Sequence, residues 1–515
     1  MRCAVVRAPL HRARVEPGVG AGCRGRVSTG RQSCAGRRQG GVATADARGS
    51  AGRQRRGTAP APGARHQGVI PVTLADLLPS LRPTLAARLE PGLWPVTTRT
   101  TSDGALQIGG VDLTELAARF GTPVQVLDTA DVRARCRAYR AALPDAEIVY
   151  AGKAFLCRGM ARLVADEGCS VDACSGGEVA VAAAAGLPGD RIVLHGTVKT
   201  DEDLKAAFAA GVGRIVLDSA AEVDRIASLA PRRQKVLLRI SPDVDAGTHP
   251  GLTTGTASSW FGMPPSEALE VAGRVLARPE LELAGLHCHL GSQVPSVSRY
   301  ERAAVRMVGV IAALRARYGV TVAELDLGGG HAVGYAEGEP CLDPAIFGRA
   351  VRGTLARACA AHGIDEPRLL VEPGRAIVAR AGVTLYRVGA VQRCGDGRTT
   401  VLVDGGMSDD PRPALYGARY PVRLVGRATR APLESVRVAG RHCESSDVIA
   451  DGVRLPADVA PGDLLAVPVS GAYHASMAST YNQVPRPPVV AVAAGASLPL
   501  LRRDTPEDLL RRDCS

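Results

Sequence analysis

The chain has 515 residues, 46% of them hydrophobic, and a formal charge of +12. This length allows a large core and two or more domains. The positive charge lies in residues 1–68, where 14 arginines and no lysine stand beside two acids, Glu16 and Asp46, so the rest of the chain is neutral overall. We therefore expect the folded part to bind no nucleic acid. No stretch of about 18 apolar residues occurs, and we expect no membrane span.

Residues 1–68 are rich in Gly, Ala, Ser and Arg. This composition predicts a disordered extension, or upstream sequence translated from an assumed start codon. A transit peptide is the competing interpretation, because such leaders are rich in arginine and poor in acids. The segment has no sustained apolar face and no uncharged apolar run long enough for a secretion signal.

The 13 cysteines are scattered through the chain, which predicts reduced and mostly buried thiols. Neither Cys169 with Cys174 nor Cys288 with His287 and His289 has the paired spacing of a zinc site. We therefore predict no metal.

Short apolar runs alternate with stretches of helical period from residue 129 onward, which predicts βα units around a parallel sheet. Eight such runs occur, at 147–153, 168–175, 191–196, 214–219, 235–241, 283–291, 324–330 and 368–375. Eight units in this length predict a (β/α)8 TIM-type barrel over 129–381. The fold class is thus α/β.

Beyond residue 381 the pattern changes to strands without long helices between them, which predicts a C-terminal all-β domain over 382–515. Residues 69–128 contain the strand-like pieces ALQIGGVDL and PVQVLD. We expect this segment to join the β domain.

The chain has four lysines: Lys153, Lys199, Lys205 and Lys235. In a barrel of this kind the active-site face lies at the C-terminal ends of the strands. Lys153 directly ends a strand beside small residues, whereas Lys199 lies beyond its strand in a loop, Lys205 lies in a polar helical stretch and Lys235 precedes its strand. A Schiff base needs a primary amine that loses its proton, which arginine does not supply. Lys153 is therefore the candidate for a bound pyridoxal phosphate, with a barrel-mouth ion pair as the alternative.

Two features at other strand ends suit a phosphate. The run Gly328–Gly330 follows a strand and lets backbone N–H groups approach an anion. Ser292 and Tyr473 each offer a hydroxyl. Such glycine runs are common, so this run alone is a weak signal.

Glu372 follows an apolar strand and precedes a Pro-Gly turn, so we expect its carboxylate near the barrel centre. A buried carboxylate needs a cationic partner. A protonated pyridine nitrogen or Arg375 would each serve. His289 projects from the sixth strand, where it would stack on a cofactor ring or pack as an ordinary core histidine.

The motifs YAGKAF, CSGGE, HCHLGSQ, DLGGG, EPGR, DGGMSDDPRPALY, CESSD and SGAYHASMASTYN resemble those of the diaminopimelate decarboxylase family, over about residues 95 to 505. The resemblance implies an alanine-racemase-like barrel, a C-terminal β domain, pyridoxal 5'-phosphate as cofactor and a homodimer with active sites shared between subunits. It also implies decarboxylation of meso-diaminopimelate to L-lysine and carbon dioxide, the last step of lysine biosynthesis. We expect a cytoplasmic enzyme.

The resemblance also assigns the cofactor residues. Lys153 would form the Schiff base, His289 would stack on the ring and Glu372 would pair with the pyridine nitrogen. The phosphate would be surrounded by Ser292, Gly329, Gly330, Gly374 and Tyr473.

Residues that hold the substrate are implied in the same way: Arg375, Arg412, Tyr416 and Glu444. Cys443 matches the proton donor that reaches in from the partner subunit. Without the family pattern, these residues would read as surface side chains and a buried thiol.

Four positions depart from the family's usual pattern: Thr197 in HGTVKT, Trp260 before FG, His331 after the glycine run and Ser446 in CESSD. Two alternatives to a lysine-forming enzyme therefore stay open. One is a decarboxylase of the same fold for ornithine, arginine or a carrier-bound amino acid. The other is a homologue that binds the cofactor without turnover. Glu444 after Cys443 argues against the ornithine type, where an aspartate is usual.

Overall fold

The computed structural model describes residues 89–90, 92–101, 105–247, 254–256 and 259–515. By its internal contacts the chain divides into two units, Met1–Pro71 and Val72–Ser515, and every described residue belongs to the second. The expectations for residues 1–68 therefore lie outside the described residues, as does the start of segment 69–128. Within the described ranges, no helix combines the length and apolar character needed to cross a bilayer.

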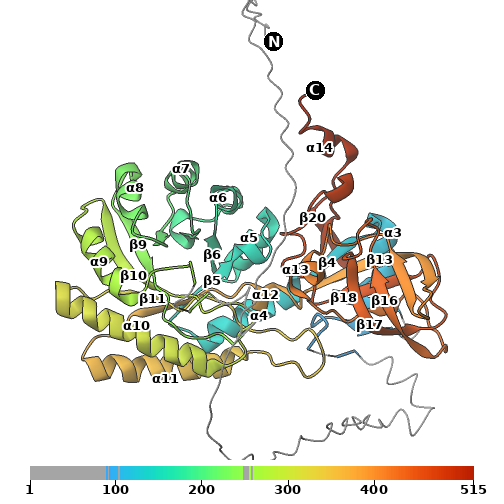
Figure 1. Ribbon diagram of the computed structural model, residues 1–515, viewed down its shortest axis with the longest axis horizontal. Coiled ribbons are helices and arrows are strands. Elements are labelled where there is room, and N and C mark those ends of the chain that lie inside the picture. The colour runs from blue at the N-terminus through green and yellow to red at the C-terminus, as the bar shows by residue number, and fades with distance from the viewer. Residues whose placement is uncertain (1–88, 91, 102–104, 248–253, 257–258) are drawn as a thin grey trace, which may run out of the picture. The chain divides into compact units, whose positions relative to one another are not determined.

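Eight parallel strands close into a barrel, as the sequence predicts (Figure 1). The strands are β5 (Glu147–Ala151), β6 (Ser170–Ala173), β7 (Ile192–Leu194), β8 (Arg214–Leu217), β9 (Gln234–Arg239), β10 (Leu281–His287), β11 (Glu324–Asp326) and β12 (Arg368–Val371). Each strand pairs with its neighbour in chain order, and β12 pairs with β5 to close the ring. The predicted fold class is confirmed.

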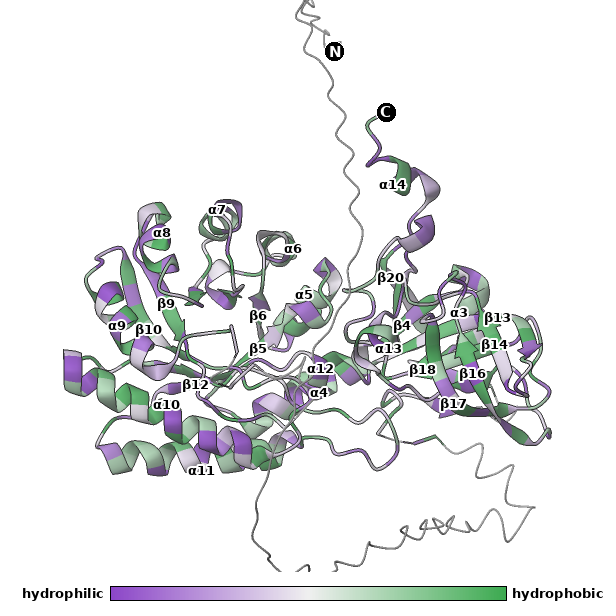
Figure 2. Ribbon diagram, viewed as in Figure 1, coloured by the Kyte–Doolittle hydropathy of each residue, from purple (hydrophilic) through white to green (hydrophobic). Residues whose placement is uncertain are grey.

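Helices lie around the barrel: α4 (Thr129–Ala142), α5 (Arg158–Asp166), α6 (Gly176–Ala184), α7 (Asp201–Ala210), α8 (Glu222–Leu229), α9 (Pro265–Leu276), α10 (Val297–Tyr318) and α11 (Pro344–His362). Figure 2 shows hydrophobic and hydrophilic residues alternating around α10 and α11, as expected of helices with one buried face. Local chemistry sets several helix starts. Thr200 and Asp203, for example, form a reciprocal capping box at the start of α7.

Side chains inside the barrel form layers, because alternate residues of a strand point the same way. At the N-terminal end, Arg214 binds Glu147 (Nη2 to Oε2, 2.9 Å) and Glu324 (Nε to Oε2, 2.6 Å). The middle layer is apolar and consists of Val149, Val193, Val216, Leu237 and Leu370. Two residues further along, four of these five strands carry polar side chains: His195, Asp218, Arg239 and Glu372. The lower layers therefore make the barrel a packed core that opens at one end.

The second domain is built on a nine-stranded sheet with the strand path β17-β16-β14-β13-β4-β19-β20. Strand β18 pairs with β13 and with β15. The bounds are β4 (Val124–Asp128), β13 (Gly382–Arg393), β14 (Thr399–Val403), β15 (Arg423–Val425), β16 (Leu433–Ala439), β17 (Val448–Pro456), β18 (Leu464–Pro468), β19 (Val489–Ala493) and β20 (Ala496–Leu501). Strand β4 lies antiparallel to β13 and parallel to β19. The domain also contains two short helices, α13 (Arg412–Tyr416) and α14 (Pro506–Leu510), so it is less purely β than expected.

Before β4, three short strands form a separate sheet: β1 (Arg99–Thr100), β2 (Leu106–Ile108) and β3 (Val111–Asp112). Helix α3 (Leu113–Phe120) follows, with the side chain of Asp112 accepting a hydrogen bond from the backbone N–H of Thr114 at its start. The domain limits expected at residues 128 and 381 stay a prediction.

The β domain contacts the barrel mouth through backbone hydrogen bonds. The N–H of Tyr473 donates to the carbonyl of Ala154 at 2.8 Å. Ala154 is the last residue of the short 3-10 turn Gly152–Ala154, which contains Lys153. Tyr473 adopts a φ of 62°, a backbone conformation unusual for a residue other than glycine. This contact brings the Tyr473 ring to the open end of the barrel.

Candidate active site

A cavity of about 170 Å³ lies at the C-terminal ends of the barrel strands. Its lining includes eight residues that the sequence singled out: Lys153, His289, Ser292, Gly330, Glu372, Gly374, Arg375 and Tyr473. They come from the ends of four barrel strands and from the β domain. The cavity therefore joins residues that lie more than 300 positions apart in the chain.

Lys153 and Glu372 face the same cavity. Partial desolvation at the cavity favours the neutral form of the Lys153 amine, but Asp172, Cys174, Tyr473 and Glu372 nearby outweigh that effect and raise its pKa. Glu372 is buried, with 4% of its surface exposed. The cavity thus offers a primary amine and a carboxylate, as predicted.

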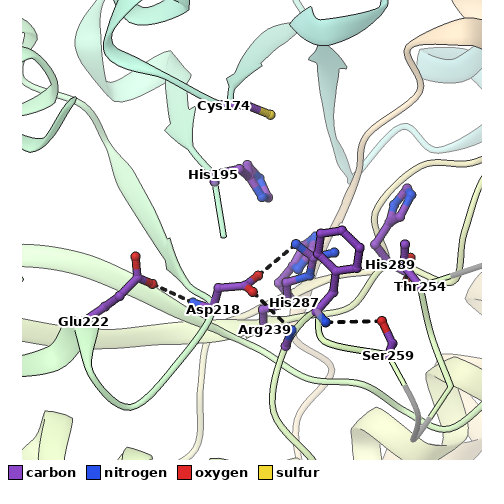
Figure 3. Close-up of polar contacts among 12 residues, drawn as sticks. Cys174, His195, Asp218, Glu222, Arg239, Thr254, Ser259, His287 and His289 are labelled. Carbon is purple, nitrogen blue, oxygen red and sulfur yellow. Dashed lines mark hydrogen bonds and ion pairs between the residues drawn. The ribbon is translucent and has the colours of Figure 1, made fainter. Parts of the chain in front are cut away.

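Glu372 is held between two histidines that the sequence analysis gave no role. The Nε2 atom of His195 lies 2.7 Å from Glu372 Oε1, and the Nε2 atom of His287 lies 3.4 Å from Oε2. Burial alone would raise the pKa of Glu372, but the two imidazoles lower it well below its usual value. His195 directly follows β7 and His287 ends β10, and both are labelled in Figure 3. The carboxylate therefore stays ionised.

The same two histidines differ in charge. Burial lowers the pKa of both, but beside Asp172 and Glu372 the pKa of His195 is raised, whereas that of His287 falls to about 4. The ligand atoms of His195, His287 and Glu372 lie within 4.8 Å of one another, a spacing that could hold a metal ion. The expectation of no metal stays a prediction. All three side chains point into the barrel above its apolar layer. His195 and His287 stand at strand ends in positions that face the barrel interior, and this position along the strand is the sequence signal for them.

The glycine turn after β11 is tightly packed. A Cβ atom on Gly329 would lie 2.0 Å from the carbonyl oxygen of Glu372, and one on Gly330 would lie 1.8 Å from that of Gly291. Gly330 also has a φ of 88°. The N–H of Gly329 donates to His289 Nδ1 at 3.2 Å, and burial lowers the pKa of His289 well below 6.5. His289 is therefore a neutral imidazole with its other nitrogen carrying the hydrogen.

Arg375 crosses from the cavity toward the β domain. Its Nη2 donates to Ser292 Oγ at 3.0 Å, and its guanidinium lies 4.6 Å from the centre of the Tyr473 ring. Since Ser292 accepts this bond, its hydroxyl hydrogen is free to donate to a ligand. Arg412 is buried near Arg375, and both guanidiniums bind the hydroxyl of Tyr335, a residue that sequence reasoning missed.

Three predicted substrate or catalytic residues are exposed and are not among those that line the cavity: Tyr416, Cys443 and Glu444. Glu444 accepts a hydrogen bond from the hydroxyl of Tyr481 at 2.7 Å. The described chain therefore does not bring them together with Lys153.

The departures from the family pattern have distinct surroundings. Beyond Thr197, Lys199 is buried and its Nζ lies 3.0 Å from both carboxylate oxygens of Glu222. Glu222 also accepts from the N–H of Asp218, whose carboxylate binds Arg239, as Figure 3 shows. Lys199 is thus a structural cation and is not free for other chemistry.

Two further departures lie at the cavity. Trp260 is 80% exposed and stands beside Phe261, which lines the cavity. His331 is buried, and a hydrogen bond of 2.7 Å joins its Nδ1 to the hydroxyl of Tyr139. Ser446 is exposed.

Comparison with known proteins agrees with this geometry. Residues 129–379 match the family described as pyridoxal-dependent decarboxylase, pyridoxal binding domain. A diaminopimelate decarboxylase of Actinosynnema pretiosum subsp. auranticum is 56% identical over 445 residues, which are 86% of this chain and 100% of that protein. The chain belongs to the diaminopimelate decarboxylase family. The enzyme is therefore a pyridoxal-phosphate-dependent decarboxylase.

Other members of the family are similar along nearly their whole length. The diaminopimelate decarboxylase of Mycobacterium tuberculosis (strain ATCC 25618 / H37Rv) is 43% identical, over 82% of this chain and 98% of that protein. The crystal structure of diaminopimelate decarboxylase from M. jannaschii in complex with L-lysine superposes with a TM-score of 0.76 at 30% identity, covering 81% of this chain and 98% of that one.

The residues around the cavity fit the family's cofactor. The amine of Lys153 suits the aldehyde, and the ionised Glu372 suits a protonated pyridine nitrogen. A glycine turn that tolerates no Cβ, together with the hydroxyls of Ser292 and Tyr473, suits a phosphate.

Proposed function

We propose that this enzyme decarboxylates meso-diaminopimelate to L-lysine and carbon dioxide. The observation that carries the proposal is the cavity itself, where the Lys153 amine and the Glu372 carboxylate face a site that ends on the buried guanidinium of Arg375. An amino-acid substrate with carboxylates needs such a cation. The family membership agrees with this substrate.

Lys153 would hold the cofactor covalently through Nζ. When bound, the cofactor withdraws the electron pair left by the departing carboxylate. Glu372 keeps the pyridine nitrogen protonated, because the carboxylate remains ionised between His195 and His287. His289, a neutral imidazole, stacks on the ring face.

The phosphate is held by Ser292, Gly329, Gly330, Gly374 and Tyr473. The free hydroxyl hydrogen of Ser292 supports this role, because Arg375 occupies its acceptor side. The backbone N–H groups of Gly330 and Gly374 supply further donors, whereas the N–H of Gly329 donates to His289 Nδ1 and contributes no hydrogen bond to the phosphate.

Arg375, Arg412, Tyr416 and Glu444 hold the substrate's carboxylates and distal amine, and Cys443 donates the proton to the α-carbon. Tyr416, Cys443 and Glu444 are exposed in the single chain. We therefore propose a homodimer in which these three residues reach the cavity of the partner subunit. We also propose a cytoplasmic location, which suits the free thiols of the described cysteines, and domain limits at residues 128 and 381.

The experiment is an assay of the purified, cofactor-loaded protein with meso-diaminopimelate, scored for carbon dioxide and lysine. We expect both products in equal amounts, and neither from Lys153→Ala. Ornithine and arginine are the comparison substrates, and we expect no release of carbon dioxide from them. Turnover of ornithine or arginine in preference to meso-diaminopimelate would replace the proposed substrate, and no turnover of any of the three would favour a cofactor-binding protein.

A further inference from the structure

The hydroxyl of Tyr335 joins two arginines that come from different domains. Arg375 Nη1 donates to it at 2.6 Å and Arg412 Nη1 at 3.1 Å. Both guanidiniums also lie over the Tyr335 ring, 5.9 and 5.1 Å from its centre. Tyr335 follows the glycine turn, Arg375 starts the short helix α12 (Arg375–Val378), and Arg412 starts α13 in the β domain. One phenol oxygen thus connects the cavity to the second domain.

Neither arginine forms an ion pair with a carboxylate among the described residues. Both are buried, with 7% and 5% of their surfaces exposed. No carboxylate oxygen of the described residues lies within 4.0 Å of either guanidinium. Two buried positive charges that converge on one oxygen repel each other and lose hydration, so a negative charge between them is strongly favoured.

Tyr335 differs from other buried tyrosines in having no acceptor for its own hydrogen. The hydroxyls of Tyr150, Tyr300 and Tyr386 donate to the carbonyl of Phe155, the carbonyl of Gly329 and the carboxylate of Asp409. A hydrogen bond joins the hydroxyl of Tyr139 to a histidine nitrogen. Among the described residues, the hydroxyl of Tyr335 meets two cationic donors and no acceptor. This arrangement stabilises an oxygen that has lost its proton.

Other charged and titratable groups around Tyr335 do not replace that charge. Glu339 accepts the backbone N–H of Tyr335 at 2.7 Å, and Asp410 accepts the backbone N–H of Arg412 at 3.3 Å. Burial raises the pKa of Asp410 to about 7. His474 is neutral, because burial lowers its pKa well below 6.5, and it contacts Tyr420, which also binds Arg412. Burial would raise the pKa of Tyr335, but the two guanidiniums outweigh it and lower that pKa.

We propose that Tyr335 is a positioning residue whose oxygen serves as the counter-anion of Arg375 and Arg412 in the empty site, and takes up a proton when a carboxylate of the ligand binds the two arginines. The inference rests on the proposed function, because that carboxylate is taken to be the substrate's. According to the proposal, binding of the ligand's carboxylate is coupled to the uptake of one proton by Tyr335. Carboxylate affinity should therefore fall as pH rises through the range in which Tyr335 loses its proton.

The test measures binding of pimelate, a seven-carbon dicarboxylate that has no amine to react with the cofactor. Calorimetry of the cofactor-loaded enzyme in buffers of different ionisation enthalpy measures the number of protons taken up per pimelate bound. This measurement is made on the unmodified enzyme. We expect proton uptake that grows toward one proton per site as the pH rises through the range in which Tyr335 loses its proton, and affinity that falls up to about tenfold per pH unit over that range. No uptake by the unmodified enzyme would overturn the proposal.

Tyr335→Phe keeps the ring over both guanidiniums and removes the oxygen. We expect this variant to lose the proton uptake and the fall of affinity with rising pH, with the cofactor absorbance kept. Tyr318→Phe, whose hydroxyl donates to the carbonyl of Leu269 on the barrel's outside, is the matched control and should behave as the unmodified enzyme. Asp410→Asn removes any change of pimelate binding near pH 7 that is caused by titration of the Asp410 carboxyl, so that change can be distinguished from the effect of Tyr335. Unchanged uptake in Tyr335→Phe would contradict the proposal.

The test distinguishes this inference from the proposed function. Pimelate binding needs no turnover, so proton uptake that depends on Tyr335, combined with no release of lysine from meso-diaminopimelate, would count against the substrate alone. Lysine formation with no effect of Tyr335→Phe on pimelate binding would count against the role of Tyr335 alone.

Discussion

The Nε2 atom of His195 lies 2.7 Å from Oε1 of Glu372 at the open end of the barrel, and both side chains are buried. Burial lowers the pKa of His195, but Asp172 and Glu372 outweigh burial and raise it above 6.5. The pKa of Glu372 is lowered well below 4.5. The pair is therefore an ion pair near neutral pH.

This pair predicts a pH dependence of stability in the cofactor-free protein. The contribution of His195 is complete below pH 6.5 and is lost as pH rises through its raised folded pKa. The contribution of Glu372 is present above pH 4.5 and is lost as pH falls through its lowered folded pKa. His195→Gln should therefore cost most, about 3 kcal/mol in the free energy of unfolding, between those two values, and less at higher pH.

Urea unfolding at about pH 5.5 and about pH 8.5 measures the difference. His362→Gln is the control, because His362 is exposed at the end of α11, and it should stay within about 0.5 kcal/mol of the unmodified protein. A cost of His195→Gln that grows with pH would contradict the ion pair.

The buried pair of Lys199 and Glu222 gives a second prediction. Lys199→Met leaves the Glu222 carboxylate buried without its cation, so we expect a loss of about 3 to 5 kcal/mol in the free energy of unfolding. The double variant Lys199→Met with Glu222→Gln should recover most of that loss, since no unpaired charge remains. Folded protein of either variant should keep the visible absorbance of the bound cofactor, and a loss of that absorbance would assign Lys199 a role in the site.

How much of this site the sequence predicted depends on where each residue lies. Lys153 and Glu372 were found because they directly follow apolar strands. His195 and His287 also occupy strand ends, but their meaning depends on which side chains point inward, and that becomes evident only once the barrel layers are in register. Tyr335 lies in an irregular segment after the glycine turn. No helical or strand periodicity in that segment predicts which side chains contact it.

The fold shows the same division. The eight barrel strands were predictable because buried parallel strands are continuous apolar runs. Strands β17 and β20 of the β domain have a weaker strand pattern, because β17 contains the Asp451-Gly452 pair and β20 contains Pro499, residues typical of turns. The burial of Lys199 was also missed, because its partner Glu222 lies 23 positions away on another βα unit.

His331 predicts an effect specific to the phosphate. Its Nδ1 shares a hydrogen bond with the hydroxyl of Tyr139, and His331 directly follows Gly330, so the bond fixes one end of the glycine turn. His331→Ala should weaken the binding of pyridoxal phosphate by about tenfold, the effect of losing one buried hydrogen bond. It should weaken the binding of pyridoxal, which has no phosphate, much less.

Equilibrium binding of both compounds to the cofactor-free protein checks this. His331→Asn retains an acceptor near the position of Nδ1 and should restore part of the affinity. Burial lowers the pKa of His331 to about 3, so the effect should be the same at every pH from about 6 to about 8. Equal losses for pyridoxal phosphate and pyridoxal would show that the turn is not the target of His331.

Shared active sites predict complementation between inactive subunits. Cys443→Ala and Lys153→Ala should each be inactive alone. In a mixture refolded together, about half of the dimers are mixed and each has one site with both residues intact, so about a quarter of the normal activity should return. Activity that stays at the level of the separate variants would place Cys443 outside the partner's site. Size measurement of the mixture confirms that dimers have formed.

The central claim is that Lys153 carries pyridoxal phosphate. Reduction of the cofactor-loaded enzyme with borohydride makes the link permanent, and mass spectrometry of the digested protein then identifies the modified lysine. We predict that the cofactor's mass is found on the peptide that contains Lys153 and on no peptide that contains Lys199, Lys205 or Lys235. A cofactor attached to Lys199, or to no lysine, would contradict the account.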